Sequence, residues 1–483
     1  MLFNSFHFLI FFPIVFLVYF AMPKNYRWYV LLASSLYFYM VWKPAYIILI
    51  IITSLVAYFS ARLIDTERYR KNKKLILILS LIINFGILFL FKYYNFFNIT
   101  LSSFLPVDLL LPRLNLLLPM GISFYTFQTA SYCIDVYRGT TPSEKNYAYL
   151  LLYVTFFPQL VAGPIERSDR LLPQLKNPKP FEYYRITEGI RYMALGMFKK
   201  VVIADNLAVC VDTVYNDVAG SNGFQLLVAL FLFSIQLYCD FAGYSDIALG
   251  AAKIFGIDLM QNFKRPYFSK SIREFWTRWH ISLSEWFKDY VYIPLGGSRR
   301  GKVRCYLNYF IIFTLSGLWH GADMSFVVWG FLQGLCIVFE MITFNLGEKI
   351  YSFLHIGQKL KNAIKIIATY LFFTFTCVFF RSSSVQDATV AIRKIWWNRA
   401  DYLNSSYIVE SLTDMNLDTF NIIFFSILLV SLFIISFLSR RESITLIVAR
   451  QKAPLRWAIY ILTALVLFVF RFSGEQNFIY FQF

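Results

Sequence analysis

The stretch LSGLWHGA, residues 315–322, places the imidazole of His320 beside glycines in a segment apolar enough to lie in lipid. An ionisable side chain at membrane depth is costly, so it marks a candidate functional site. The alternative is a structural histidine whose ring nitrogens hydrogen-bond to neighbouring helices. Gly317 and Gly321 flank the imidazole one helical turn apart, and residues without a side chain let another group approach the backbone closely. This pattern favours an acyl chain or a narrow tunnel next to His320.

A second histidine, His280, closes a similar Trp279-His280 pair forty residues earlier. It lies in a basic and aromatic run, residues 273–292, where charged and aromatic side chains alternate at roughly helical spacing. Such a pattern predicts a helix that lies at the membrane interface or dips into it. The turn PLGGSRR at residues 294–300 then carries adjacent cations, which suits either an anion site or a cytoplasmic turn with orienting charges.

Composition sets the class of protein. Apolar residues make up 58% of the 483 residues and charged residues only 15%, and apolar runs recur from end to end. This composition predicts a polytopic membrane protein. The net charge of +18 comes from Lys and Arg between the apolar runs, which indicates membrane orientation and anionic lipid headgroups rather than nucleic acid. The six cysteines have no paired spacing, so we expect neither a disulfide framework nor a zinc site.

Apolar runs of roughly 20 residues mark the expected membrane spans. We place them near residues 6–21, 27–42, 45–63, 75–95, 115–133, 201–214, 225–257, 305–320, 325–345, 365–381, 418–438 and 455–471. Basic residues concentrate in 62–74 and 264–304, so these segments should face the cytoplasm, while the acidic loop 382–418 should face outside. Alternation then predicts about 11–12 crossings, with both termini outside.

Several segments are too polar or too short for a plain span. The span at 115–133 carries many hydroxyl and amide groups and should face a protein interior or a water-filled cavity. Residues 147–161 are apolar but short and are flanked by cations on both sides, which predicts a re-entrant hairpin. Residues 239–246, which include Asp240 and Asp246, should break the passage through 225–257. The piece between Pro106 and Pro112 should lie in the interface.

These segments suggest a cavity that spans the membrane around the two histidines. If Arg304 lies inside, a rise of ~1.5 Å per residue puts His320 past the midplane, toward the outside. Burial disfavours a charged imidazole, and a neutral one can take a proton from a hydroxyl that attacks an acyl group. The sequence lacks G-x-S-x-G, H-E-x-x-H and a phosphate-binding P-loop.

A set of motifs in fixed order carries a family resemblance. They are PQLVAGP (158–164), KKVVIAD (199–205), CDFAGYSD (239–246), SIREFW (271–276), WHISLS (279–284), YIPLGG (292–297), GLWHG (317–321) and FIYFQF (478–483). Together they resemble the membrane-bound O-acyltransferases, and within them the bacterial branch that acetylates alginate and peptidoglycan. The resemblance runs almost end to end.

The resemblance implies transfer of an acetyl group from cytoplasmic acetyl-CoA, with no permanently bound cofactor or metal, through the bacterial cytoplasmic membrane to an exported polysaccharide. It implies an extracytoplasmic SGNH or esterase-like partner that passes the acetyl group to the sugar. His320 matches the catalytic histidine and His280 the second motif histidine, on the donor side. The residues expected to bind the donor or line its tunnel are Trp279, Trp319, Gly317, Gly321, Asp240, Asp246, Arg278 and Tyr292.

The expected architecture is a single all-α membrane domain over residues 1–483, with re-entrant and interfacial helices around a central catalytic tunnel. Residues 1–112 would form N-terminal helices, 113–345 the catalytic core and 346–483 the C-terminal helices. Two other functions stay open at this point: D-alanyl transfer to teichoic acids, and a non-enzymatic acyl transporter or scaffold.

Overall fold

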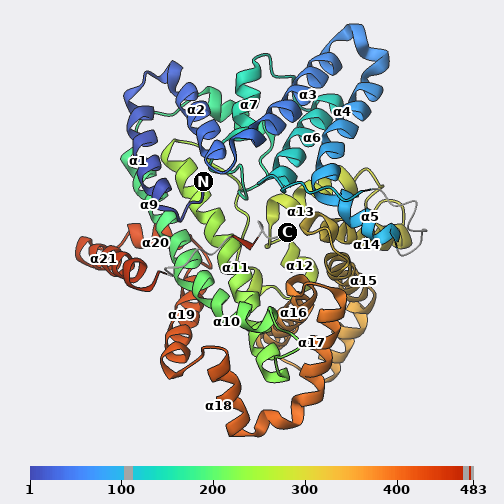
Figure 1. Ribbon diagram of the computed structural model, residues 1–483, viewed down its shortest axis with the longest axis vertical. Coiled ribbons are helices and arrows are strands. Elements are labelled where there is room, and N and C mark those ends of the chain that lie inside the picture. The colour runs from blue at the N-terminus through green and yellow to red at the C-terminus, as the bar shows by residue number, and fades with distance from the viewer. Residues whose placement is uncertain (103–111, 472–477, 480–483) are drawn as a thin grey trace. The chain divides into compact units, whose positions relative to one another are not determined.

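The computed structural model of the protein describes residues 1–102, 112–471 and 478–479. Within these residues every regular element is a helix (Figure 1). The chain divides into two compact units that are interleaved in sequence. Residues 1–194 with 244–261 form the first unit, and residues 195–243 with 262–483 form the second. The interfacial piece predicted between Pro106 and Pro112 falls largely outside the described residues.

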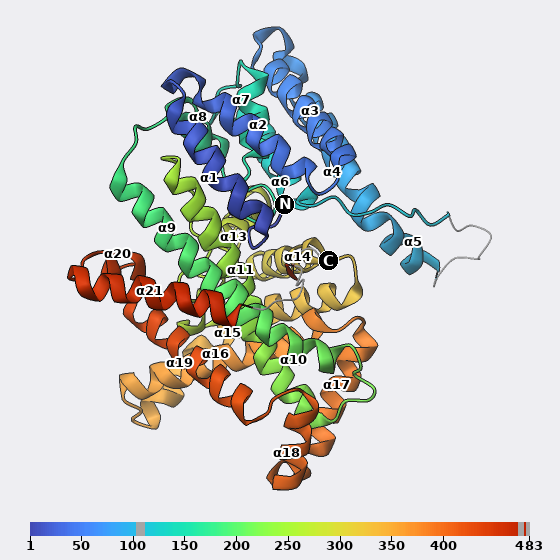
Figure 2. The same ribbon diagram turned by 60° about the vertical axis from the view of Figure 1, so that its left-hand side comes forward.

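The first unit contains most of the N-terminal helices. They are α1 (Phe6–Ala21), α2 (Arg27–Met40), α3 (Ile47–Asp65), α4 (Lys73–Leu88), α5 (Tyr94–Ser102), α6 (Ile122–Arg138), α7 (Tyr147–Thr155), α8 (Ser168–Lys176) and α9 (Tyr183–Met197). Helices α3, α4 and α6 pack side by side (Figures 1 and 2). The polar helix α6 is buried throughout 122–133, which confirms that it faces a protein interior. It begins later than the predicted span at 115–133, because Gly121 takes a left-handed conformation just before it.

The second unit contains the remaining helices. They are α10 (Asp205–Tyr215), α11 (Gly223–Ile254, whose last turns belong to the first unit), α12 (Ile272–Trp276), α13 (Ile281–Phe287), α14 (Lys302–His320), α15 (Met324–Phe353), α16 (Gln358–Arg381), α17 (Val385–Trp397), α18 (Ser405–Asp414), α19 (Thr419–Leu438), α20 (Ile444–Ala449) and α21 (Ala453–Phe470). The predicted hairpin of 305–320 and 325–345 is confirmed as α14 and α15. The segment 382–418, which the sequence predicted to be a loop, contains the helices α17 and α18.

Two predictions about local structure are wrong. The expected break at residues 239–246 is absent, because α11 runs unbroken from Gly223 to Ile254. Gly243 lies within it where a Cβ atom would come 2.7 Å from the carbonyl oxygen of Gly196, so this glycine permits close helix packing instead of a turn. The expected single helix over 273–292 is divided into α12 and α13, with His280 between them.

Seven helices among the described residues are long and apolar enough to cross a membrane, judged by length and composition. They lie in Pro44–Asp65, Glu67–Leu101, Gly223–Ile254, Met324–Phe353, Gln358–Arg381, Thr419–Leu438 and Ala453–Phe470, and α1 is a shorter apolar helix. The protein is therefore an all-α, multi-pass membrane protein. The sidedness of its loops and the count of 11–12 crossings stay predictions.

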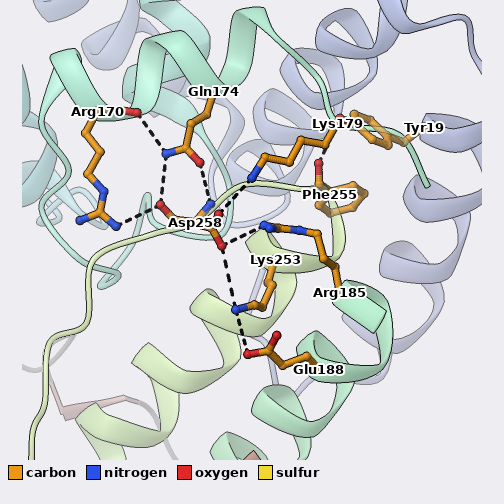
Figure 3. Close-up of polar contacts among 9 residues, drawn as sticks. All are labelled: Tyr19, Arg170, Gln174, Lys179, Arg185, Glu188, Lys253, Phe255 and Asp258. Carbon is orange, nitrogen blue, oxygen red and sulfur yellow. Dashed lines mark hydrogen bonds and ion pairs between the residues drawn. The ribbon is translucent and has the colours of Figure 1, made fainter. Parts of the chain in front are cut away.

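An ionic cluster fixes the turn that follows α11 in the first unit (Figure 3). The Asp258 carboxylate forms ion pairs with the Arg185 guanidinium, at an N–O distance of 2.9 Å, and with the Lys179 ammonium, at 3.2 Å. The Lys253 ammonium lies 4.0 Å from the same carboxylate. The backbone of Asp258 pairs with the side-chain amide of Gln174 through both its N–H and its carbonyl group. Burial alone would raise the pKa of Asp258, but hydrogen bonds and charge from Arg185 and Lys179 outweigh it and hold the pKa below its usual value.

Candidate active site

His320 is the last residue of α14, and tight contact with α15 fixes its place. A Cβ atom on Gly317 would lie 2.2 Å from the carbonyl oxygen of Phe326, and one on Gly321 would lie 2.2 Å from the Phe326 ring. These glycines therefore let α14 and α15 approach closely, and their role in lining a tunnel stays a prediction. The turn between the helices ends at Asp323, whose carboxylate accepts the Ser325 N–H at the start of α15.

Aromatic rings from several helices surround the His320 imidazole, which is 3% exposed. The Trp329 ring from α15 stands perpendicular to it with ring centroids 5.2 Å apart, and the Phe380 ring from α16 lies at 5.5 Å. Trp329 and Phe380 also contact each other at 5.0 Å. The candidate base therefore lies among apolar surfaces that keep bulk water away.

His280 lies at a backbone break, with φ of 43°, between α12 and α13. Asn262 secures the start of α13, because its backbone carbonyl accepts the Ile281 N–H and its side-chain oxygen accepts the Ser282 hydroxyl at 2.7 Å. The His280 side chain is fully buried, and the Phe241 ring from α11 meets it edge-on at 4.5 Å. Burial, together with the nearby His320 imidazole, lowers the pKa of His280 well below its usual value, so the ring is neutral near pH 7.

The structure brings the two histidines together within the second unit. Their ring centroids are 6.3 Å apart, although forty residues separate them in sequence. Trp319 contacts both rings, at 5.7 Å from His280 and 5.0 Å from His320. Trp319 is thus a wall of the candidate site.

A buried ion cluster lies on the α11 side of the same unit. The Lys200 ammonium lies 2.5 Å from the Asp240 carboxylate and 2.8 Å from that of Asp205. The Ile479 N–H also donates to Asp240, at 2.8 Å. Asp240 therefore holds helices and the C-terminal segment together, and Phe241, the next residue, reaches His280.

The other predicted site residues lie in varied settings. Trp279 is buried and stacks on Phe275 with centroids 5.4 Å apart, and Arg278 forms an ion pair with Glu274 at 2.5 Å. Tyr292 lies 3.3 Å from the Cys305 sulfur. Asp246 lies in the part of α11 that belongs to the first unit and is partly buried. Donor binding by any of these residues stays a prediction.

Sequence reasoning missed several residues that contact or support the site. Trp329, Phe380 and Phe241 lie in apolar runs, where an aromatic residue carries no signal of its own. Gln333 and Glu340 of α15 could have been found, because polar side chains inside an apolar span are expensive unless they have partners. In the part of the chain that the structure describes, no group of three or more His, Cys, Asp or Glu side chains could hold a metal ion.

Comparison with known proteins places this arrangement in a family. The profile of MBOAT, the membrane-bound O-acyltransferase family, matches residues 142–385, which include both histidines. The "Probable alginate O-acetylase AlgI" of Pseudomonas syringae pv. tomato is 38% identical over 392 residues, covering 80% of this chain and 74% of the relative. The chain belongs to the membrane-bound O-acyltransferase family. This MBOAT protein is therefore an O-acyltransferase, and the transporter or scaffold alternative is set aside.

Two further relatives differ in how much of the chain they match. The peptidoglycan O-acetyltransferase of Helicobacter pylori is 34% identical over 420 residues, covering 79% of this chain and 77% of that protein. The teichoic acid D-alanyltransferase of Bacillus subtilis is 30% identical over 252 residues, covering 49% of this chain and 62% of that protein. This MBOAT chain is thus similar along most of its length to the O-acetylating relatives.

Proposed function

We propose that this MBOAT protein takes an acetyl group from cytoplasmic acetyl-CoA and passes it through the bacterial cytoplasmic membrane for O-acetylation of an exported polysaccharide. An extracytoplasmic, esterase-like partner would accept the group and deliver it to the sugar hydroxyl. The observation that carries the proposal is the pairing of His320 with His280, 6.3 Å apart between ring centroids and walled by Trp319, Trp329 and Phe380.

The proposed chemistry starts from the buried imidazole of His320. His320 takes the proton of the acceptor hydroxyl as the hydroxyl oxygen attacks the thioester carbonyl carbon. The C–S bond then breaks, an ester forms, and the leaving thiolate regains the proton. His280 lies on the segment expected at the cytoplasmic side, so its role is to hold or relay the thioester donor. The surrounding aromatic rings limit access of water, which would otherwise hydrolyse the thioester.

The extent of similarity favours acetyl over D-alanyl transfer. The O-acetylating relatives match about four-fifths of this chain, whereas the D-alanyltransferase of B. subtilis matches 49%. A D-alanyl donor would also have to be presented by a carrier protein. Acetyl-CoA needs no such carrier protein, and it fits the greater similarity of this chain to the O-acetylating relatives.

The donor can be tested with purified protein in lipid nanodiscs in the presence of the acceptor. We expect [¹⁴C]acetyl-CoA to be consumed, with release of free CoA measured by mass spectrometry, and D-alanyl-loaded carrier protein to be left unchanged. A matched sample with His320→Ala corrects for spontaneous hydrolysis. Turnover of the D-alanyl carrier alone would replace the proposed donor, and turnover of neither would contradict the proposal.

A further inference from the structure

One face of α15 carries polar side chains that reach the segment bearing His280. Gln333 and Glu340 are seven residues apart on α15, so about two helical turns separate them on the same face. Trp329, which contacts His320, lies one turn before Gln333 on that face. Trp329, Gln333 and Glu340 thus form a stripe on α15. Its first member contacts the His320 imidazole, and the other two contact α12.

Gln333 joins three helices through hydrogen bonds in a dry interior. Its side-chain oxygen accepts the indole N–H of Trp276 from α12 at 3.2 Å, and its nitrogen donates to the Thr376 hydroxyl from α16 at 2.8 Å. The orientation of the amide is determined, because an indole N–H can only donate. Gln333 and Thr376 are fully buried, so loss of either partner would leave a polar group unsatisfied away from water.

Trp276 transmits this restraint to the candidate base. Its ring meets the Trp329 ring at 73° with centroids 5.7 Å apart, and Trp329 in turn stands perpendicular to the His320 imidazole. The bond from Gln333 therefore sets where one wall of the His320 site stands. Thr376 lies one turn from Phe380 on α16, so the same amide also restrains a second wall.

Glu340 fixes the other end of α12. Its carboxylate accepts the Ile272 N–H, with oxygens at 2.8 and 3.1 Å, and lies 3.3 Å from the Arg273 N–H. A carboxylate at the start of a helix satisfies donors that have no partner within the helix. Glu340 thus anchors the segment that leads, eight residues after Ile272, to His280.

We infer that Gln333 and Glu340 are positioning residues that hold the His280 segment in register with His320. Neither residue touches the reacting atoms in this account. Gln333 sets the Trp276–Trp329 contact, and Glu340 sets the start of α12. The activity measurements that test this inference rest on the proposed function. A second test, chemical labelling of the histidines, rests on the structure alone.

The main variants are Gln333→Leu and Glu340→Leu, with Glu340→Gln as the conservative partner that keeps an oxygen to accept the backbone N–H. Thr343→Val is the matched control, because Thr343 also lies on α15 but bonds only to its own helix, at the Phe339 carbonyl. We expect Gln333→Leu and Glu340→Leu to lower kcat about 10- to 100-fold, as small misplacements of reacting groups do. The KM for acetyl-CoA should rise as well, because the displaced His280 segment holds the donor. Glu340→Gln should recover most of the wild-type kcat and KM, and Thr343→Val should match wild type.

A second measurement does not depend on acetyl transfer. Diethyl pyrocarbonate modifies accessible imidazoles, and mass spectrometry can follow its rate at His320 and His280 separately in folded protein. We expect faster labelling of at least one of these rings in Gln333→Leu and Glu340→Leu, and unchanged labelling in Thr343→Val. If wild type consumes no acetyl-CoA, the proposed function fails while the labelling still decides the positioning role. Unchanged labelling, or an unchanged kcat per folded molecule in an active enzyme, would overturn the inference.

Discussion

The two histidines come from regions that are built in different ways. His320 ends a regular helix of 19 residues whose contact with α15 depends on glycines. His280 lies at a left-handed break between helices of five and seven residues, and bonds from Asn262 and Glu340 hold that segment. The first region is fixed by close helix packing, and the second by individual hydrogen bonds. The two should therefore respond differently to substitution.

The largest effect is expected where α14 meets α15. Gly317→Leu would force a side chain against the Phe326 carbonyl oxygen, 2.2 Å from the position of its Cβ atom, so the hairpin must open. We predict loss of folded protein, measured as the monodisperse fraction in size-exclusion chromatography after extraction. Gly347→Leu, on α15, is the control, because a Cβ atom there meets nothing within 4 Å. Normal yields of Gly317→Leu would contradict the packing role.

A smaller effect is expected at the left-handed break. His280→Ala should lower the stability by roughly 2–5 kcal/mol, because it removes a fully buried ring that packs against Phe241. Alanine also keeps the backbone strain that any residue with a Cβ atom has at positive φ. His280→Gly and His280→Asn tolerate this conformation and should unfold at higher temperatures than His280→Ala. All three should lose acyl transfer if the imidazole handles the donor. Equal melting temperatures for Ala and Gly would show that backbone strain is not important here.

The smallest effect is expected in the ionic cluster of the first unit, where no helix packing is at stake. Asp258→Asn removes the ion pairs with Lys179 and Arg185 but keeps the backbone bonds to Gln174. The side chain of Asp258 is 43% exposed, so solvent screens the loss and the melting temperature should fall only slightly.

The pH dependence of that loss has a definite sign. The folded-state pKa of Asp258 is lowered, so its ion pairs stabilise the protein above the usual carboxylate pKa of 3.8 and cease to do so as the pH falls through the folded value. The difference in melting temperature between wild type and Asp258→Asn should therefore be present at pH 7 and shrink as the pH falls below 3.8 toward the folded pKa. A difference that grew on acidification would contradict this assignment.

The sequence predicted the region of His320 better than that of His280, for a physical reason. An apolar run with glycines at one-turn spacing specifies a helix packed on another helix, and α14 and α15 have this form. The break at His280 depends on Asn262 and Glu340, which are distant from His280 in sequence, so no pattern around His280 itself indicates the break. The same holds for the unbroken α11, where the polar residues that suggested a break are satisfied by tertiary partners such as Lys200.

The site was predicted in part. The histidines were recognisable as ionisable groups in apolar or aromatic surroundings, and the family resemblance is confirmed by the matching relatives. Their closeness to each other was not readable, because 6.3 Å between the rings results from packing of α11, α13 and α14. Nor could the sequence identify Trp329 or Phe380, since aromatic residues are abundant throughout the chain.

The central claim is that His320 supplies the base for acyl transfer. The direct test compares His320→Ala with His7→Ala, which removes an imidazole hydrogen-bonded to Tyr37 in the first unit. The rate of CoA release in the presence of the acceptor is measured per molecule of folded protein. We predict a fall on the order of 10²- to 10⁴-fold for His320→Ala, because a general base contributes about that much, and a wild-type rate for His7→Ala. A folded His320→Ala protein that still transfers acetyl groups at the wild-type rate would contradict the account.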